Sequence, residues 1–199
     1  MEFNVQKYDP NHHIGLYQFP YEICDDLMNW YDASPDKSNG LAGGHIPEKI
    51  TAKKSTDVTV LSHHRTDKAI ANYLTCLGYV LDDYYKMFPS SGGPGAWKLD
   101  IVEPFNIQRY KPGEGFFQWH YERQPHKPSC DRVLVFMTYL NSVDDAGTDF
   151  MYQNLSTQCN KGHTVIWPAD WTYTHKGQIS KEYEKTIITG WVSYTGEVG

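Results

Sequence analysis

The stretch Lys185-Thr-Ile-Ile-Thr-Gly-Trp-Val-Ser-Tyr194 is the longest of seven extended runs in the second half of this 199-residue chain. It is rich in β-branched and aromatic residues, which favour β-strands. Side chains alternate across a strand, so every second residue is expected on one face: Lys185, Ile187, Thr189, Trp191 and Ser193. An ammonium on such an inward-looking face is costly to bury unless it meets an anion, which makes Lys185 a candidate binding residue.

Six further runs of the same composition precede this one, and Gly, Pro, Asn and Asp bound them. They cover residues 97–102, 106–110, 116–122, 133–140, 147–152 and 162–167. Short strands of this kind predict an antiparallel double sheet or barrel with helices packed outside it. The expected fold class is therefore mainly β with packed helices.

Two helices are expected before residue 95. Pro20 opens the first, and Thr66 or Asp67 precedes the second, which carries apolar residues at spacings of three and four. These residues are Ile70, Tyr73, Leu74, Leu77, Leu81, Tyr84, Tyr85 and Phe88. Such a stripe is typical of a helix face buried against a sheet and requires no functional explanation.

The length fits a single domain over residues 1–199. We expect a helical support region over residues 1–95, with a mobile loop at 34–56 that could close over a substrate, and a β-rich core over residues 96–199. The loop is expected because this stretch is polar and contains several glycines.

Composition limits the classes of partner. The net charge is -6 and no basic stripe stands out, so nucleic acid is not an expected partner. The four cysteines form no Cys-x-x-Cys pair. No leader peptide and no membrane-spanning run are recognisable, so a reducing cytoplasmic setting is expected.

The run Phe116-Phe-Gln-Trp-His-Tyr-Glu122 carries the chemistry. If it is a strand, His120 and Glu122 project from the same face, with Gln118 beside them. One imidazole and one carboxylate are two of the three ligands of a facial 2-His-1-carboxylate metal site. A lone His-x-Glu pair is more often a surface feature, so the interpretation depends on a third ligand.

Three histidines could supply that ligand: His126, His163 and His175. We favour His175, because Lys185 follows ten residues later and opens the last strand. His12, His13, His45, His63 and His64 have no such spacing and are interpreted as surface or helix-entry residues.

Five blocks of the chain, taken together, resemble the prolyl 4-hydroxylase-like branch of the iron(II)/2-oxoglutarate-dependent oxygenases. They are Gln108–Gly113, Phe117–Glu122, Thr138–Asn141 with Gly147–Phe150, Ile166–Pro168, and His175 followed by Lys185–Trp191. The resemblance covers about the C-terminal half. It implies a double-stranded β-helix, a cupin-like jelly roll, with N-terminal α-helices packed on one sheet.

The same resemblance implies roles for individual residues. His120, Glu122 and His175 would be the catalytic iron(II) ligands, and Lys185 would pair with the distal carboxylate of 2-oxoglutarate. Tyr110 and Thr189 would hydrogen-bond that carboxylate, Tyr139 and Trp191 would line its pocket, and Arg132 would touch the substrate. Two positions depart from the family's pattern, since Asp is commoner at the position of Glu122 and Arg is frequent at that of Lys185.

The expected activity is hydroxylation of a C–H bond by a dioxygenase that uses iron(II), 2-oxoglutarate and O2, with ascorbate as a possible addition. A prolyl or other residue of a protein or peptide is the leading substrate. The alternatives are a hydroxylase of a small molecule, such as a free amino acid, and a non-catalytic metal-binding jelly-roll protein. Zinc would suit the last, but it gives no reason for a lysine at position 185.

Overall fold

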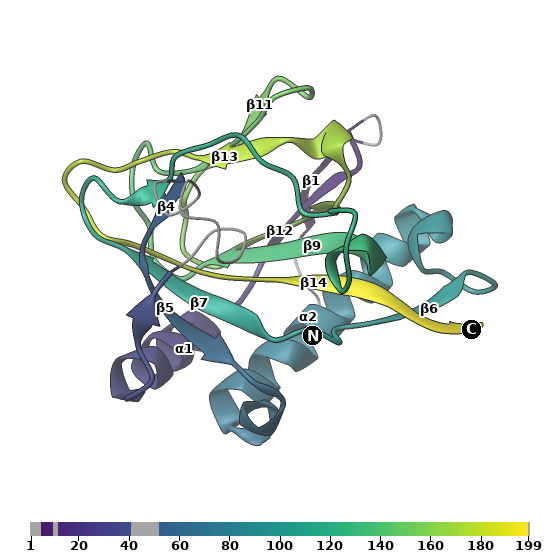
Figure 1. The fold of residues 1–199 in the computed structure, drawn as a ribbon, viewed down its shortest axis with the longest axis horizontal. Coiled ribbons are helices and arrows are strands. Elements are labelled where there is room, and N and C mark those ends of the chain that lie inside the picture. Colours follow the sequence, from purple (N-terminus) through teal and green to yellow (C-terminus); the bar gives the residue numbers. More distant parts are fainter. Residues whose placement is uncertain (1–4, 10–11, 41–51, 199) are drawn as a thin grey trace.

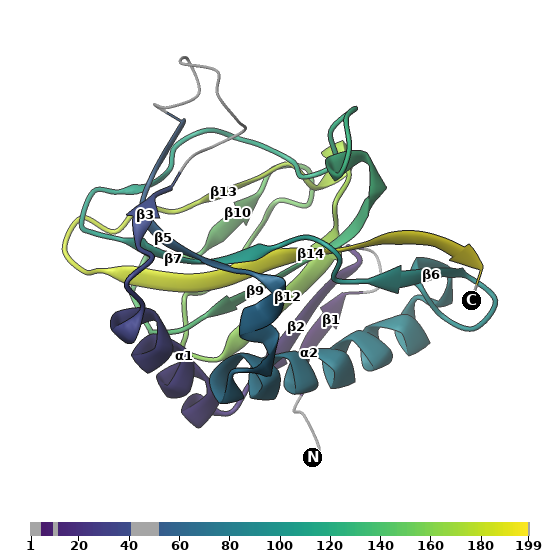
Figure 2. The ribbon, with the colours of Figure 1, turned by 60° about the horizontal axis from the view of Figure 1, so that its bottom comes forward.

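The structure, a computed structural model, describes residues 5–9, 12–40 and 52–198. Within these residues a large antiparallel sheet lies between two α-helices on one side and a smaller sheet on the other (Figures 1 and 2). This layering confirms the expected mainly β fold with packed helices.

The helices are α1 (Tyr21–Ala33) and α2 (Lys68–Met87), with short 3-10 turns at Ser62–Thr66, Pro89–Ser91, Ser129–Asp131 and Trp171–Tyr173. The strands up to the middle of the chain are β1 (Val5–Asp9), β2 (Ile14–Gln18), β3 (Ser38–Asn39), β4 (Lys53–Lys54), β5 (Thr56–Val60), β6 (Trp97–Asp100) and β7 (Phe105–Tyr110). The later strands are β8 (Gly115–Phe116), β9 (Arg132–Tyr139), β10 (Thr148–Phe150), β11 (Leu155–Ser156), β12 (His163–Pro168), β13 (His175–Gly177) and β14 (Lys185–Val198).

The large sheet has the strand order β1-β2-β12-β9-β14-β7-β5-β3, and β6 also pairs with β14. The smaller sheet has the order β11-β10-β13, and β4 pairs with β8 separately. Strand β14 lies between β9 and β7, and its register sets Lys185 opposite Tyr110 and Ile187 opposite Tyr139. The stretch Lys185–Tyr194 therefore lies in a central strand of the large sheet.

The two helices cover one face of the large sheet (Figure 2). Leu27 of α1 and Leu77 of α2 pack in one core cluster with Phe136 and Ile188 of the sheet. The start of α2 is tied to α1, because the Trp30 indole donates to Asp67 Oδ2 at 2.9 Å. Both predicted helices are confirmed, and the apolar stripe of the second is buried as expected.

The opposite face of the sheet lines the interior between the two sheets. A second core cluster there includes Val135, Met137 and Ile187 from the large sheet and Phe150 from the smaller one. Alternation along β14 places Lys185 on this inner face together with Ile187. The site described below is built inside this second cluster.

The N-terminal half is less purely helical than expected. It supplies β2, which pairs with β12, and β1, which pairs with β2 at the edge of the sheet. It also supplies β5, which pairs with β7, and β3, which pairs with β5. Their edge pairing is a tertiary contact that local composition does not encode. The central part of the predicted loop at 34–56, residues 41–51, lies outside the described residues.

Neither described α-helix is long and apolar enough to span a membrane.

Candidate active site

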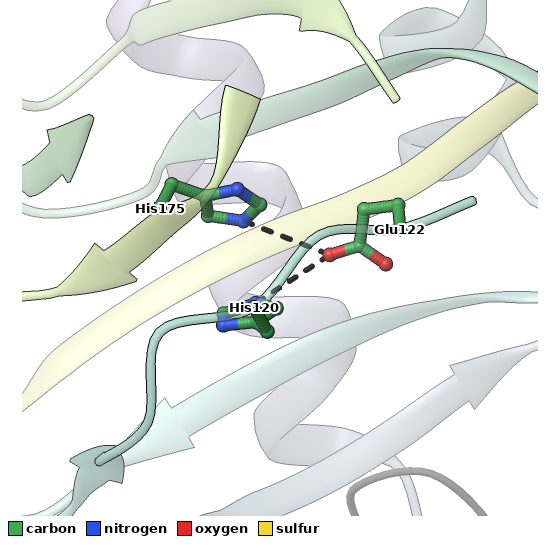
Figure 3. A group of neighbouring side chains, drawn as sticks. All are labelled: His120, Glu122 and His175. Carbon is green, nitrogen blue, oxygen red and sulfur yellow. Dashed lines mark ion pairs between the residues drawn. The ribbon is translucent and has the colours of Figure 1, made fainter. Parts of the chain in front are cut away.

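Three side chains predicted from the sequence meet in the interior. Ligand atoms of His120, Glu122 and His175 all lie within 4.8 Å of one another (Figure 3). Glu122 Oε1 is 3.5 Å from His120 Nε2 and 3.6 Å from His175 Nε2. One carboxylate oxygen thus faces two imidazole nitrogens, which is the arrangement of three ligands around one cation.

The orientation of both imidazoles follows from neighbouring carbonyls. His120 Nδ1 lies 3.0 Å from Gln118 O, and His175 Nδ1 lies 2.9 Å from Tyr173 O. A carbonyl only accepts hydrogen bonds, so in each ring Nδ1 carries the proton and the Nε2 lone pair points to the centre of the group. Backbone contacts of this kind fix the tautomer that a metal needs.

The backbone brings these residues together differently from the prediction. The run 116–122 is not one strand, because β8 ends at Phe116 and residue 120 forms a single bridge. The N–H of His120 donates to His175 O at 3.0 Å, and that of His175 donates back at 2.9 Å. The N–H groups of Phe117 and Glu122 donate to Ala52 and Ala169, so this segment changes partner along its length.

Electrostatics keep the group in the form that binds a cation. Burial, and next the charge of His120, lower the pKa of the His175 imidazole to about 4, so it is neutral at pH 7. Burial alone would raise the pKa of the Glu122 carboxyl, but the two imidazoles and Arg132 outweigh it and lower that pKa. The group at neutral pH is therefore one carboxylate and at least one neutral imidazole.

The two other candidate histidines lie elsewhere. His126 is exposed in the loop before β9, and His163 is buried at the start of β12 with no hydrogen-bond partner at Nδ1. Neither is part of the three-residue group. The preference for His175 therefore agrees with the geometry.

Lys185 is buried on the inner face and pairs across the sheet with Tyr110. Its ammonium donates to Ala146 O at 3.0 Å and Gln178 O at 2.8 Å, and it forms no ion pair among the described residues. Burial lowers its pKa to about 8. A buried ammonium held by two carbonyl oxygens and a neutral ring retains its unbalanced charge, which a carboxylate could neutralise.

Of the other predicted co-substrate residues, Tyr110 and Tyr139 lie in the second core cluster, and the Lys185 ammonium is 5.5 Å from the centre of the Tyr110 ring. The hydroxyl of Tyr110 donates to Gln108 Oε1 at 2.5 Å, and that of Tyr139 lies 2.8 Å from the hydroxyls of Thr148 and Thr157. The Thr189 hydroxyl donates to Phe136 O at 3.1 Å.

Thr189 also lies well away from Lys185 along β14. By the rise of a strand, their Cα atoms are about 13 Å apart. A shared contact of Thr189 and Lys185 with one distal carboxylate therefore stays a prediction, as do the carboxylate contacts assigned to the neighbouring tyrosines.

Residues 105–193 match the model of the 2OG-Fe(II) oxygenase superfamily. This stretch of the chain belongs to the 2OG-Fe(II) oxygenase superfamily. The matched residues contain the three-residue group, Tyr110 and Lys185. No protein with a curated description matches the sequence significantly.

Solved structures of prolyl hydroxylases are similar to this oxygenase in fold. The viral collagen prolyl hydroxylase of Paramecium bursaria Chlorella virus-1 is 18% identical with a TM-score of 0.65, and the match covers 90% of this chain and 95% of that one. A Pseudomonas putida prolyl-4-hydroxylase is 15% identical with a TM-score of 0.67, covering 93% and 94%. A Trichoplax adhaerens prolyl hydroxylase, in complex with a hypoxia-inducible-factor peptide, is 13% identical with a TM-score of 0.64, covering 88% and 78%. These similarities confirm the double-stranded β-helix.

The donor set of the oxygenase fits the metal that the superfamily implies. Two imidazole nitrogens and a carboxylate oxygen are the donors of a facial triad, which leaves coordination positions open for a chelating co-substrate and oxygen. The buried ammonium of Lys185 fits a diacid such as 2-oxoglutarate for the reason given above.

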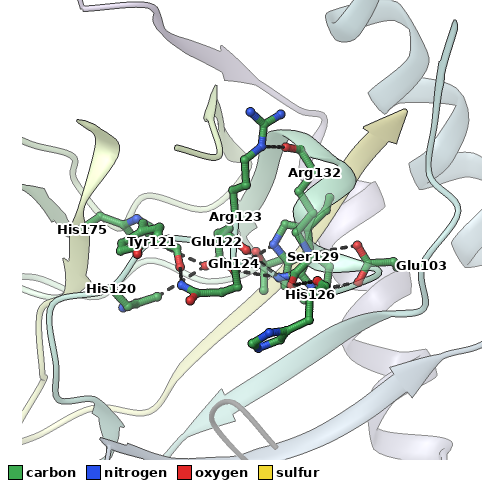
Figure 4. Close-up of polar contacts among 12 residues, drawn as sticks. Glu103, His120, Tyr121, Glu122, Arg123, Gln124, His126, Ser129, Arg132 and His175 are labelled. Carbon is green, nitrogen blue, oxygen red and sulfur yellow. Dashed lines mark hydrogen bonds and ion pairs between the residues drawn. The ribbon is translucent and has the colours of Figure 1, made fainter. Parts of the chain in front are cut away.

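Sequence reasoning missed two residues of this site. Gln108 receives the Tyr110 hydrogen bond, and its position two residues away on the same strand could have identified it. Glu103 forms an ion pair with Arg132 beside Glu122 (Figure 4), and it follows no pattern in the sequence. Arg132 itself, predicted to touch substrate, lies between these two carboxylates.

Proposed function

We propose that this oxygenase hydroxylates a C–H bond with iron(II), 2-oxoglutarate and O2, and that a prolyl residue of a protein or peptide is its substrate. The observation that carries the proposal is the meeting of His120, Glu122 and His175 around one point on the inner face. The similarity in fold to proteins described as prolyl hydroxylases supports the choice of substrate.

When bound, the iron and 2-oxoglutarate supply the oxidising chemistry, in which 2-oxoglutarate and O2 become succinate and CO2 and one oxygen atom enters the substrate. The chain holds the geometry. His120 and His175 present unprotonated Nε2 atoms, and Glu122 supplies a negative charge. Lys185 would neutralise the distal carboxylate of the co-substrate.

The walls of the site also exclude water. Met137, Val165 and Ile187 are buried on the inner face, and Phe116 stacks on His120 with ring centroids 3.7 Å apart. An apolar interior around polar ligands strengthens electrostatic interactions and limits side reactions. The site would therefore admit a substrate C–H bond from the side of His120 and Glu122, which are less buried than His175.

Succinate release tests the proposal. The purified chain is supplied with iron(II), 2-oxoglutarate, O2 and ascorbate, together with prolyl peptides or free amino acids. We expect peptide-dependent succinate release, its loss in His120→Ala, and no change in His63→Ala, which removes an exposed histidine outside the site. Stimulation by free amino acids alone would favour the small-molecule hydroxylase.

A second measurement tests the metal site without turnover. Anaerobic addition of iron(II) and 2-oxoglutarate should produce a weak visible charge-transfer band in the wild type and none in His120→Ala. If the wild type shows no band and retains zinc through purification, the non-catalytic metal-binding protein is the better description.

A further inference from the structure

The two oxygens of the Glu122 carboxylate have different surroundings. Oε1 faces the two imidazoles, as described above. Oε2 accepts a hydrogen bond from the Trp191 indole Nε1 at 2.9 Å and from Arg132 Nη1 at 3.4 Å. The same Nη1 donates to the backbone oxygen of Glu122 at 3.1 Å. Oε2 is therefore turned toward fixed donors on the side away from the histidines.

The Arg132 guanidinium is itself held in place. Its Nε lies 2.9 Å from Glu103 Oε1 and its Nη2 lies 2.7 Å from Glu103 Oε2, a bidentate pair (Figure 4). Its central carbon lies 3.5 Å from the centre of the Trp191 ring. The side chains of Arg132 and Glu103 are only 14% and 8% exposed. Bidentate pairing and stacking are geometries that arginine provides and lysine does not.

The contacts of Oε2 affect how many coordination positions stay free on a metal bound at Glu122. An octahedral metal with three protein ligands has three positions left, of which a chelating 2-oxo acid takes two. A glutamate that bound through both oxygens would take the last position. Glutamate has one more rotatable bond than the aspartate commoner in this superfamily, so its second oxygen needs an anchor to stay away from the metal.

We propose that Arg132, Trp191 and Glu103 are positioning residues that hold Glu122 to single-oxygen coordination. The inference rests on the proposed function, because it requires a metal at His120, Glu122 and His175. Arg132 acts through Oε2 of Glu122, and Glu103 acts by fixing Arg132. Glu103 lies two residues before the stretch that matches the superfamily model, so the match itself does not include this partner of Arg132.

Manganese(II) is the probe, because its effect on water proton relaxation reports whether a water molecule remains on the metal. The wild-type complex with 2-oxoglutarate should keep one exchangeable water. Arg132→Lys and Trp191→Phe, which keep the charge and the ring, should each lower the relaxation enhancement and weaken manganese binding about tenfold. The double variant should weaken binding by less than the product of the single effects, since both act on one oxygen.

The matched control is Arg109→Lys. Arg109 also stacks on an aromatic ring, 4.2 Å from the centre of Tyr31, and pairs with the carboxylates of Asp32 and Glu184. It lies on the helix side of β7, away from the metal site, and its variant should bind manganese as the wild type does. Glu103→Gln, with an unchanged melting temperature as the folding check, replaces Arg132→Lys if that variant does not fold.

Two results would overturn the inference in distinguishable ways. If wild type binds manganese through His120 but the folded Arg132 and Trp191 variants match it in affinity and relaxation, the positioning role is wrong and the metal site stands. If the wild type does not bind manganese, or His120→Ala binds it equally well, the proposed function fails together with the positioning role.

Discussion

At the scale of single residues, Lys185 lies in an environment that its residue type rarely occupies. It is a buried ammonium with two carbonyl partners and no ion pair among the described residues. Between pH 8 and 10.5 the unfolded lysine holds more protons than the folded one, so the free energy of unfolding rises with pH in that window. A buried ammonium without an anion destabilises the ligand-free protein, and such a residue is expected where a bound ligand supplies the negative charge.

The pH dependence of co-substrate binding follows. The affinity for 2-oxoglutarate should be constant below the Lys185 pKa of about 8 and should fall as the pH rises above it, because the empty site then loses its ammonium. Calorimetric titration of the manganese-loaded protein between pH 7 and 9 measures this. Lys185→Arg is the control, since a guanidinium stays charged throughout. A wild-type affinity that is flat over this range would contradict the assigned role.

At the scale of elements, β14 contributes side chains to the core clusters on both faces of the large sheet. Ile187 and Trp191 belong to the cluster around the site, whereas Ile188 and Val192 belong to the cluster that the helices cover. Gly190 lies on the helix side, where an added Cβ would be 2.5 Å from Phe105 Cβ and 2.5 Å from Phe136 Cζ. Two phenylalanine side chains therefore occupy the space that any larger residue would need.

Gly190→Ala should consequently destabilise the protein by about 1–3 kcal/mol through overpacking. Gly78 is the matched control, because it is exposed in the middle of α2 and an added Cβ would meet nothing within 4 Å. Gly78→Ala should stabilise the protein by about 0.5–1 kcal/mol, since glycine is a poor helix former. Urea denaturation measures both changes, and equal effects of the two substitutions would contradict the packing described for β14.

At the scale of the whole molecule, the helices cover one face of the large sheet, and β13, which begins at His175, lies on the other side (Figure 2). Leu77 of α2 is fully buried in the first core cluster, whereas His175 packs against Trp167 of the second cluster, and His120 lies beside His175. Stability and metal binding should therefore be separable.

Leu77→Ala should cost about 2–5 kcal/mol of unfolding free energy by leaving a cavity. Manganese affinity, measured well below the lowered melting temperature, should not change. Leu74→Ala, which truncates a half-buried leucine one turn earlier, should cost less. A loss of manganese affinity in folded Leu77→Ala would mean that the helix layer shapes the metal site directly.

The sequence by itself determined the helices, most strands after residue 95 and the residue types of the site. Apolar periodicity indicated α2, and alternation along residues 185–194 indicated the inner face of β14. These patterns are local, because each depends on residues within a few positions of one another. The histidine and glutamate that could bind a metal were found in the same way, with His175 favoured by its distance from Lys185.

Only the tertiary structure decided how these pieces meet. The segment after Phe116 does not continue as a strand, because its N–H groups pair in turn with Ala52, His175 and Ala169. Strand β2 pairs with β12 and strand β5 pairs with β7, and in both cases the partner lies far away in the sequence. Glu103 reaches Arg132 across 29 positions, and no local pattern encodes a contact between side chains so far apart.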